Sequence, residues 1–305
     1  MTLLLVPALL LASAEPTSGI AWTRDHRRAF QEARERRQPV LLQFRGAGCD
    51  LPSAPGAVDS RNISGTRATG IDRPVHDTRL SDCDLMQVDV WEKPEVAERT
   101  RRFQAVLVDG ADPDLRVRYQ VVRMPTVLLA DPWGNEILRF TGYHPREAVS
   151  KALDAMPEDF GPLEKAGLAL QKEDRDAVAL VDAARFWEGV GLRQTSERMY
   201  DLALATGHWK DDPKGRREVV VARGVNLMRM QRNKDAAKLF EDALGEDPAG
   251  SGSDALLYGL LAARLQDGNR KGAQSAYQEL QRRFPASPYT QRAGQVLAAA
   301  EPKKD

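Results

Sequence analysis

The sequence lacks an excess of charge of either sign, a long apolar run, and more than two cysteines. Lysine plus arginine and aspartate plus glutamate each number 44, so the formal net charge is zero. This balance gives no support to nucleic acid or an acidic membrane as the partner. The apolar run near the N-terminus falls short of the ~20 residues that a membrane span needs, so no integral span is predicted. The two cysteines are Cys49 and Cys83. Two cysteines commonly pair in an exported chain and are more often free in the cytosol.

Residues 1–19 are interpreted as a signal peptide and leader. The apolar run Leu3–Leu11 is followed by Ala12-Ser13-Ala14, which is similar to a signal-peptide cleavage site. We therefore expect cleavage near Ala14 and a periplasmic or secreted protein. No lysine or arginine precedes the run, and the alternative is a mobile or wrongly assigned start.

The chain is long enough for about two domains, and residues 20–156 alternate between helix and strand signals. Apolar runs predict strands at 39–44, 103–110, 127–130 and 137–141. A first helix is predicted after Trp22, with Thr23 as its N-cap. Another helix closes the region before the chain changes character.

Motifs in this region resemble those of thioredoxin-like domains of the type found at the end of thiol:disulfide interchange proteins. They are the Trp22-led helix, the strand Pro39–Phe44, the run Cys83, Met86, Trp91, Pro94 and Val96, the strand end Val108-Asp109, Pro125, and the hairpin Asp131–Gly134. The resemblance implies an α/β thioredoxin-like fold, with a central mixed sheet flanked by helices. It also implies a cis bond between Met124 and Pro125, beside the active-site sulfur, where backbone would pair with an extended substrate. A trans proline opening an edge strand is the alternative.

The cysteine pair of that family is split in this chain. Cys49 matches the first cysteine and Cys83 the second, but 33 residues, Asp50 to Asp82, separate them in place of two. This insert is rich in Gly, Pro, Ser, Asp and Arg and is predicted to be a surface loop, 50–82. The resemblance makes a Cys49–Cys83 disulfide sterically reasonable. Three states stay open: a structural bond, a working redox pair, and two free thiols.

A metal site is a further alternative at the same place. Cys49, His76 and Cys83, with Asp50 or Asp82, offer sulfur and imidazole ligands that suit copper or zinc. No tight ligand spacing supports such a site. Neither a metal nor another cofactor is therefore predicted.

Residues 162–302 carry only helix signals and resemble tetratricopeptide repeats. One repeat places Gly224, Ala236, Phe240, Ala243 and Pro248 at the family's small, Ala, aromatic, Ala and Pro positions; the next places Gly268, Ala273, Tyr277, Leu280 and Pro285; a looser one uses Ala184, Tyr200 and Ala203. An ordinary helical bundle is the alternative. The change at Met156–Pro162 predicts two separable domains.

Two functions of different classes follow. The first is an exported interaction protein with weak or absent redox activity, whose helical repeats bind a protein or peptide partner. The second is a thiol–disulfide oxidoreductase of the cell envelope that uses Cys49 and Cys83, with Met124 and Pro125 binding substrate. The first is favoured because the insert removes the tight turn that C-x-x-C chemistry depends on.

Overall fold

The computed structural model describes residues 19–46, 49, 80–248 and 250–300. The predicted signal peptide, and residues 50–79 of the predicted insert with His76, lie outside the described residues. Within the described ranges, no helix is both long enough and apolar enough to cross a membrane.

The first part of the chain is a four-stranded sheet flanked by helices. Its elements are α1 (His26–Arg36), β1 (Val40–Arg45), α2 (Asp82–Leu85), the π-helix η1 (Met86–Trp91), α3 (Pro94–Thr100), β2 (Gln104–Asp109), α4 (Pro113–Arg118), β3 (Thr126–Ala130), β4 (Glu136–Thr141) and α5 (Arg146–Asp154). The strand order is β2-β1-β3-β4, with β1 parallel to β2 and the other pairs antiparallel. The mixed sheet and its four predicted strands are thus confirmed.

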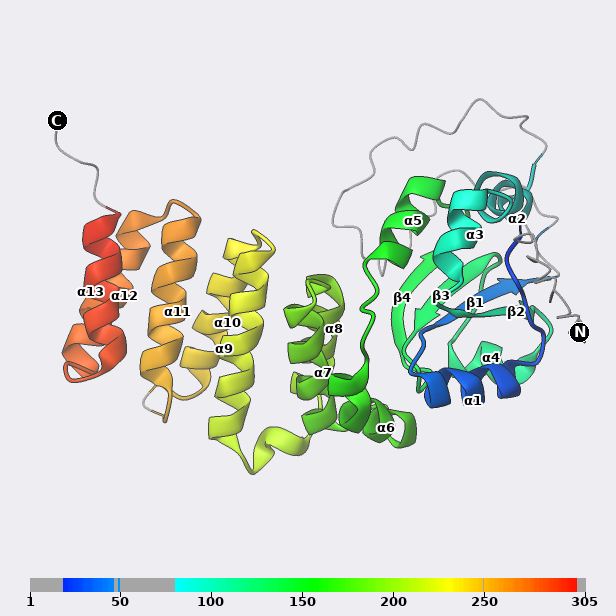
Figure 1. Cartoon of the computed structure of the whole chain (residues 1–305). Helices are drawn as coiled ribbons and strands as arrows, with labels where there is room; N and C mark the ends of the chain where they lie inside the picture. Colours follow the sequence, from blue (N-terminus) through cyan, green and yellow to red (C-terminus); the bar gives the residue numbers. More distant parts are fainter. Residues whose placement is uncertain (1–18, 47–48, 50–79, 249, 301–305) are drawn as a thin grey trace, which may run out of the picture.

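Helices cover both faces of this sheet. Figure 1 shows α1 and α4 along one face, and α2, α3 and α5 along the other. Val40, Leu42 and Phe44 of β1 join the core cluster of α1 and α4, whereas Leu41 joins the cluster of α3 and α5. Because both faces of β1 are buried, its sequence is apolar almost throughout.

The start of α1 differs from the prediction. Asp25 is the N-cap, and its side chain accepts a hydrogen bond from the backbone N–H of Arg28. Thr23, the predicted cap, instead pairs with the edge of β2, donating its N–H to the Ala105 carbonyl at 2.9 Å. A threonine fits a strand edge well, and an aspartate two residues later is an equally good cap.

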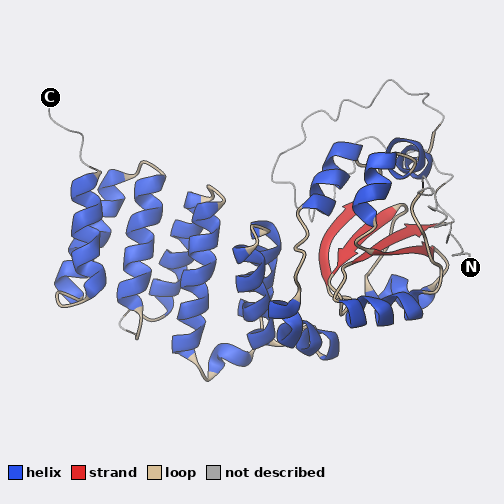
Figure 2. Ribbon diagram, viewed as in Figure 1, coloured by secondary structure: helices blue, strands red, loops and turns tan. Residues whose placement is uncertain are grey.

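Beyond α5, every element that the structure describes is helical, as Figure 2 shows. The elements are η2 (Gly161–Leu163), α6 (Glu164–Lys172), α7 (Ala177–Gly189), α8 (Arg193–Leu204), η3 (His208–Lys210), α9 (Pro213–Arg229), α10 (Asn233–Glu246), α11 (Ser253–Gln266), α12 (Arg270–Arg283) and α13 (Pro288–Ala299). From α6 to α13 each α-helix packs against the next one along the chain. The all-helical character of this region is as predicted.

Glycines allow two of these helices to approach Phe240 closely. Phe240 is fully buried on α10, and a Cβ on Gly224 of α9 or Gly259 of α11 would lie 2.1 or 2.7 Å from its ring. Gly224, which matches the small-residue position of a repeat, makes this close approach. Gly268, which matches the same position of the next repeat, does not: it lies in the turn after α11 with φ 77°, and no atom lies within 4 Å of where its Cβ would be.

The helical region and the sheet share one buried cluster, which includes Leu41 and Trp133 from the first part and Trp187 and Tyr200 from the helices. Trp133, in the turn between β3 and β4, packs on Gly167 of α6, where a Cβ would lie 2.1 Å from the indole ring. Trp133 therefore requires a residue without a side chain at position 167 of the facing helix.

Polar contacts from α8 cover the edge strand β4. Arg198 donates to the carbonyls of Glu136 and Ile137 at 2.6 and 3.2 Å, and the Thr195 hydroxyl donates to the Ile137 carbonyl at 3.2 Å. Covering an edge in this way prevents pairing with other strands. The predicted separability of the two parts stays untested, and these contacts favour mutual stabilisation.

Candidate functional site

Cys49 and Cys83 form a disulfide between the end of β1 and the start of α2. The sulfur atoms are 2.02 Å apart and the Cα atoms 5.3 Å apart, across a sequence separation of 34. The pairing implied by the resemblance is present, and neither thiol is free. Cys83 is the second residue of α2, so its sulfur lies at the first turn of that helix.

Both cysteines are buried. Cys83 is 0% exposed and Cys49 is 7% exposed. The backbone N–H of Gly46 donates to the Cys49 sulfur at 3.3 Å, and the Cys49 N–H donates to the Gly46 carbonyl at 2.9 Å. Gly46 also approaches Gly110, whose nitrogen would lie 2.9 Å from a Cβ at position 46. A glycine at 46 therefore lets the strand ends come together beneath the disulfide.

The predicted insert ends slightly earlier than expected. Asp82 already belongs to α2, and Ser81 is its N-cap. The Ser81 hydroxyl accepts from the Asp84 N–H, while the Asp84 carboxylate accepts from the Ser81 N–H, so the two form a capping box. Ser81 and Asp82 are thus part of the structured framework that holds Cys83.

The bond between Met124 and Pro125 is cis, as the resemblance implies. An ion pair joins this segment to α2, because Arg123 contacts Asp82 at 3.3 Å. Arg123 immediately precedes Met124, and Asp82 immediately precedes Cys83. The Pro125 carbonyl accepts from the Gly142 N–H at 2.8 Å, and the Met124 side chain lies beside Gly110. The structure therefore links the cis-proline segment to the disulfide through side chains that the sequence analysis did not single out.

Further charged groups surround the start of α2. Arg45 contacts Asp84 at 3.3 Å. His144 is half-buried, and burial lowers its pKa, although a hydrogen bond with the Thr141 backbone and the charge of Asp82 oppose that shift. Burial thus favours the neutral imidazole of His144 beside the ion pair of Asp82 and Arg123 at the start of α2.

The metal alternative has no support in this geometry. Cys49 and Cys83 are bonded to each other, so neither offers a thiolate, while His76 and Asp50 lie outside the described residues. Over the residues that are described, no cluster of three His, Cys, Asp or Glu side chains is arranged to hold a metal ion.

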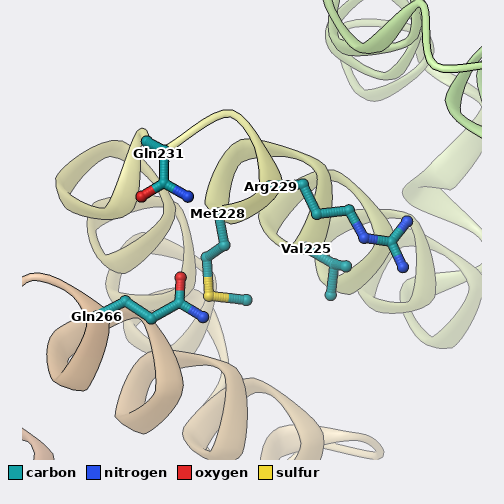
Figure 3. A pocket seen from close by; sticks show the side chains of 5 residues that line it. All are labelled: Val225, Met228, Arg229, Gln231 and Gln266. Carbon is teal, nitrogen blue, oxygen red and sulfur yellow. The ribbon is translucent and has the colours of Figure 1, made fainter.

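The helical region carries a separate pocket of about 490 Å³. Figure 3 shows its lining side chains: Val225, Met228, Arg229 and Gln231 from α9 and the turn after it, and Gln266 from α11. Arg229 also forms an ion pair with Glu188 of α7. The repeat pattern of the sequence predicted a binding surface on the helices but did not indicate these residues.

Comparisons with known proteins support the fold of the first part. A thioredoxin-like domain family matches residues 74–157 of the chain. A solved structure described as a DsbH oxidoreductase is also similar, with 17% identity and a TM-score of 0.30. The match covers 47% of this chain and 90% of the chain in that structure. No curated protein matches the sequence. The family match, the strand order and the cis-proline segment together identify the first part of the chain as a thioredoxin-like domain.

Proposed function

We propose that this chain is an exported protein-binding scaffold. Its thioredoxin-like domain uses Cys49–Cys83 as a structural bond, and its helical repeats bind an extended segment of another protein. The observation that carries the first half of this proposal is the burial of both cysteines, 7% and 0% exposed, at the junction of β1 and α2. We place the domain limits at 20–156 and 162–302.

A redox role requires that a thiolate reach one of the sulfurs. Thiol–disulfide exchange begins when a thiolate attacks a disulfide sulfur, so its rate depends on access to that sulfur. Cys49 is the more exposed of the two, and it already accepts a hydrogen bond from Gly46. Burial of both cysteines therefore favours slow exchange and a bond that stays oxidised.

A structural role is sufficient to account for the bond. Closing a loop with a sequence separation of 34 stabilises a fold by about 4 kcal/mol in the chain-entropy model. Such bonds persist in oxidising compartments, which supports a periplasmic or secreted location. The long insert is thereby tied at both ends to the sheet and to α2.

The helical region supports the binding half of the proposal. Stacked helix pairs of this kind present one continuous face to a partner. The glycines that contact Phe240 are consistent with the close helix approach of tetratricopeptide repeats. The pocket between α9 and α11 is the place on this region where we expect a partner side chain to insert.

The reduction potential of Cys49–Cys83 tests the proposal. We expect a value below about −300 mV, typical of structural bonds. Insulin reduction should be much slower than with a C-x-x-C thioredoxin. Turnover comparable to such an enzyme, and lost in both Cys49→Ser and Cys83→Ser, would instead establish the oxidoreductase function.

A further inference from the structure

The turn after α9 differs from the turns after α7 and α11, which lie at the same place in their helix pairs. The pairs α7–α8, α9–α10 and α11–α12 are each joined through one residue in the left-handed conformation: Gly191, Gln231 and Gly268, with φ 86°, 61° and 77°. In each turn the next residue donates its N–H to a carbonyl five residues back: Leu192 to Trp187, Arg232 to Leu227, and Asn269 to Arg264. The three turns thus share one geometry, but the middle one carries a side chain at the left-handed position.

Glycine suits this position better than glutamine does. In the left-handed conformation the Cβ of an L-residue crowds the following carbonyl oxygen, so Gly191 and Gly268 adopt it without the strain that Gln231 bears. Contacts of the glutamine side chain do not compensate for this strain. The side chain is exposed, and its amide forms no hydrogen bond with another described residue. Folding alone therefore gives no reason for a glutamine at position 231.

Gln231 instead lines the pocket between α9 and α11. Figure 3 shows Gln231 and Gln266 at one end of this pocket beside Met228, and Arg229 at the other end. Gln266 is also exposed, and over the described ranges its amide is likewise not hydrogen-bonded. Each carboxamide offers two N–H donors and an acceptor oxygen. Two amide groups from two different helix pairs are thus available to a ligand at one end of the pocket.

The charged group of the pocket is already neutralised. Arg229 forms an ion pair with one carboxylate oxygen of Glu188, and the other oxygen accepts from the Tyr200 hydroxyl at 3.3 Å. A charged ligand group would therefore be attracted by one member of this pair and repelled by the other. The pocket favours a neutral group that both donates and accepts hydrogen bonds.

We propose that Gln231 and Gln266 bind an asparagine or glutamine side chain of the partner segment. The carboxamide of the partner donates to the oxygen of one glutamine and accepts from the amide nitrogen of the other, and its methylene groups lie on Val225 and Met228. A carboxamide carries its donor and its acceptor on separate atoms, so it can bond to two glutamines side by side. This role rests on the proposed binding function of the helical region, and it makes Gln231 a specificity-determining residue that is strained in the folded chain.

Selection from a displayed library of random peptides on the full chain tests this role. We expect the selected peptides to share an asparagine or glutamine at one position. A labelled synthetic copy is then bound to the wild type and to variants, with fluorescence anisotropy as the readout. Gln231→Met removes one amide at similar length, and Gln266→Ala removes the other. Gln278→Ala is the matched control, since Gln278 is an exposed glutamine of α12 that does not line the pocket.

Both pocket variants should bind about fivefold more weakly than the wild type, and Gln278→Ala should bind equally well. Replacing the shared asparagine or glutamine of the peptide by leucine should weaken binding to the wild type by a similar factor. It should cause little further loss with Gln231→Met, because the same hydrogen bond is already absent. Selected peptides without a shared carboxamide, or pocket variants that bind like the wild type, would overturn this role and leave the binding function standing. A selection that yields no saturable binder would contradict the binding function itself, and this role with it.

The thermal stability of the same variants gives a readout that needs no ligand. Gln231→Gly relieves the left-handed strain, so it should raise the Tm by about 1–3 °C while it weakens peptide binding. Gln231→Met keeps the strain and should leave the Tm unchanged. If Gln231→Gly is less stable than the wild type, the glutamine serves folding, and a role kept for the partner is overturned.

Discussion

The thioredoxin-like domain and the helical region differ in how far along the sequence their contacts reach. In the domain, β1 pairs with β2 and β3, and Cys49 is bonded to Cys83 across 34 positions. In the helical region, each helix packs mainly against its sequence neighbours. Long-range pairing has a large loop-closure cost, whereas local pairing gains stability step by step. The domain therefore depends more than the helical region on single long-range contacts, such as the disulfide, that one substitution can remove.

The largest effect that we expect comes from removing the disulfide. Cys49→Ala/Cys83→Ala should lower the free energy of unfolding of the domain by about 4 kcal/mol. Hydrogen exchange measured by mass spectrometry should show faster exchange in β1–β4 and α2. Exchange in α10–α13 should be little changed, because the buried residues of those helices belong to a different cluster from the sheet.

The single variant Cys49→Ala is the control for this measurement. It leaves Cys83 in place but removes the bond, so it should match the double variant. Equal protection of the sheet in the wild type and the double variant would show that other contacts hold the end of β1 beside α2. Equal loss of protection in α10–α13 would erase the distinction between the two regions.

The sequence carried enough information for most of the domain. Val40–Phe44 is apolar except for Gln43, and Val127–Ala130 is apolar throughout, because helices bury both faces of these strands; their positions were therefore predictable. The cysteine pairing and the cis bond at Pro125 followed from a resemblance to known domains. The N-cap of α1 did not follow, because Thr23 and Asp25 are both good caps and only the tertiary pairing of Thr23 with β2 decides between them.

The contacts between the two parts were not predictable in the same way. Arg198 and Thr195 resemble ordinary helix residues, yet they cover the edge of β4. Gly268 matched a repeat position by spacing, but Gly259 makes the contact with Phe240. In each case the deciding partner lies on another element, so the local pattern contains no signal for it.

The next prediction concerns the pH dependence of stability that arises from Asp131, in the β3–β4 turn that packs on α6. Burial raises the pKa of Asp131 to about 6 from an ordinary 3.8, although hydrogen bonds from Asn135 and Trp133 favour the carboxylate. The folded state therefore holds this proton more tightly than the unfolded state. The stabilising contribution of protonated Asp131 is complete below about pH 4 and is lost as the pH rises through about 6. The change is on the order of 3 kcal/mol.

Asp131→Asn isolates this contribution, because other groups also titrate in this range. Urea unfolding of the wild type and the variant should be compared between about pH 4 and 7. As the pH rises, we expect the free energy of unfolding of the wild type to fall relative to that of Asp131→Asn. A difference that does not change with pH would show that Asp131 keeps an ordinary pKa in the folded chain.

The smallest effects that we predict compare glycines in the two regions. Gly167→Ala puts a methyl group against Trp133 at the junction, and Gly224→Ala puts one against Phe240 within the helical region. Each should lower the free energy of unfolding by about 1–3 kcal/mol through overpacking, which outweighs the better helix propensity of alanine. Gly189→Ala is the matched control, since Gly189 lies at the end of α7 with no atom within 4 Å of its Cβ position. It should be neutral or stabilising by up to about 1 kcal/mol.

The two glycine substitutions should differ in which part of the chain loses protection from hydrogen exchange. Trp133 belongs to the cluster that spans the sheet and α6–α8, so Gly167→Ala should speed hydrogen exchange on both sides of the junction. Phe240 belongs to the cluster of the later helices, so Gly224→Ala should leave exchange in β3 and β4 unchanged. If Gly167→Ala affects α6 alone, the sheet does not depend on the helices and the two parts are separable. If it affects β3 and β4 as well, the edge contacts of Arg198 and Thr195 are part of what stabilises the thioredoxin-like domain.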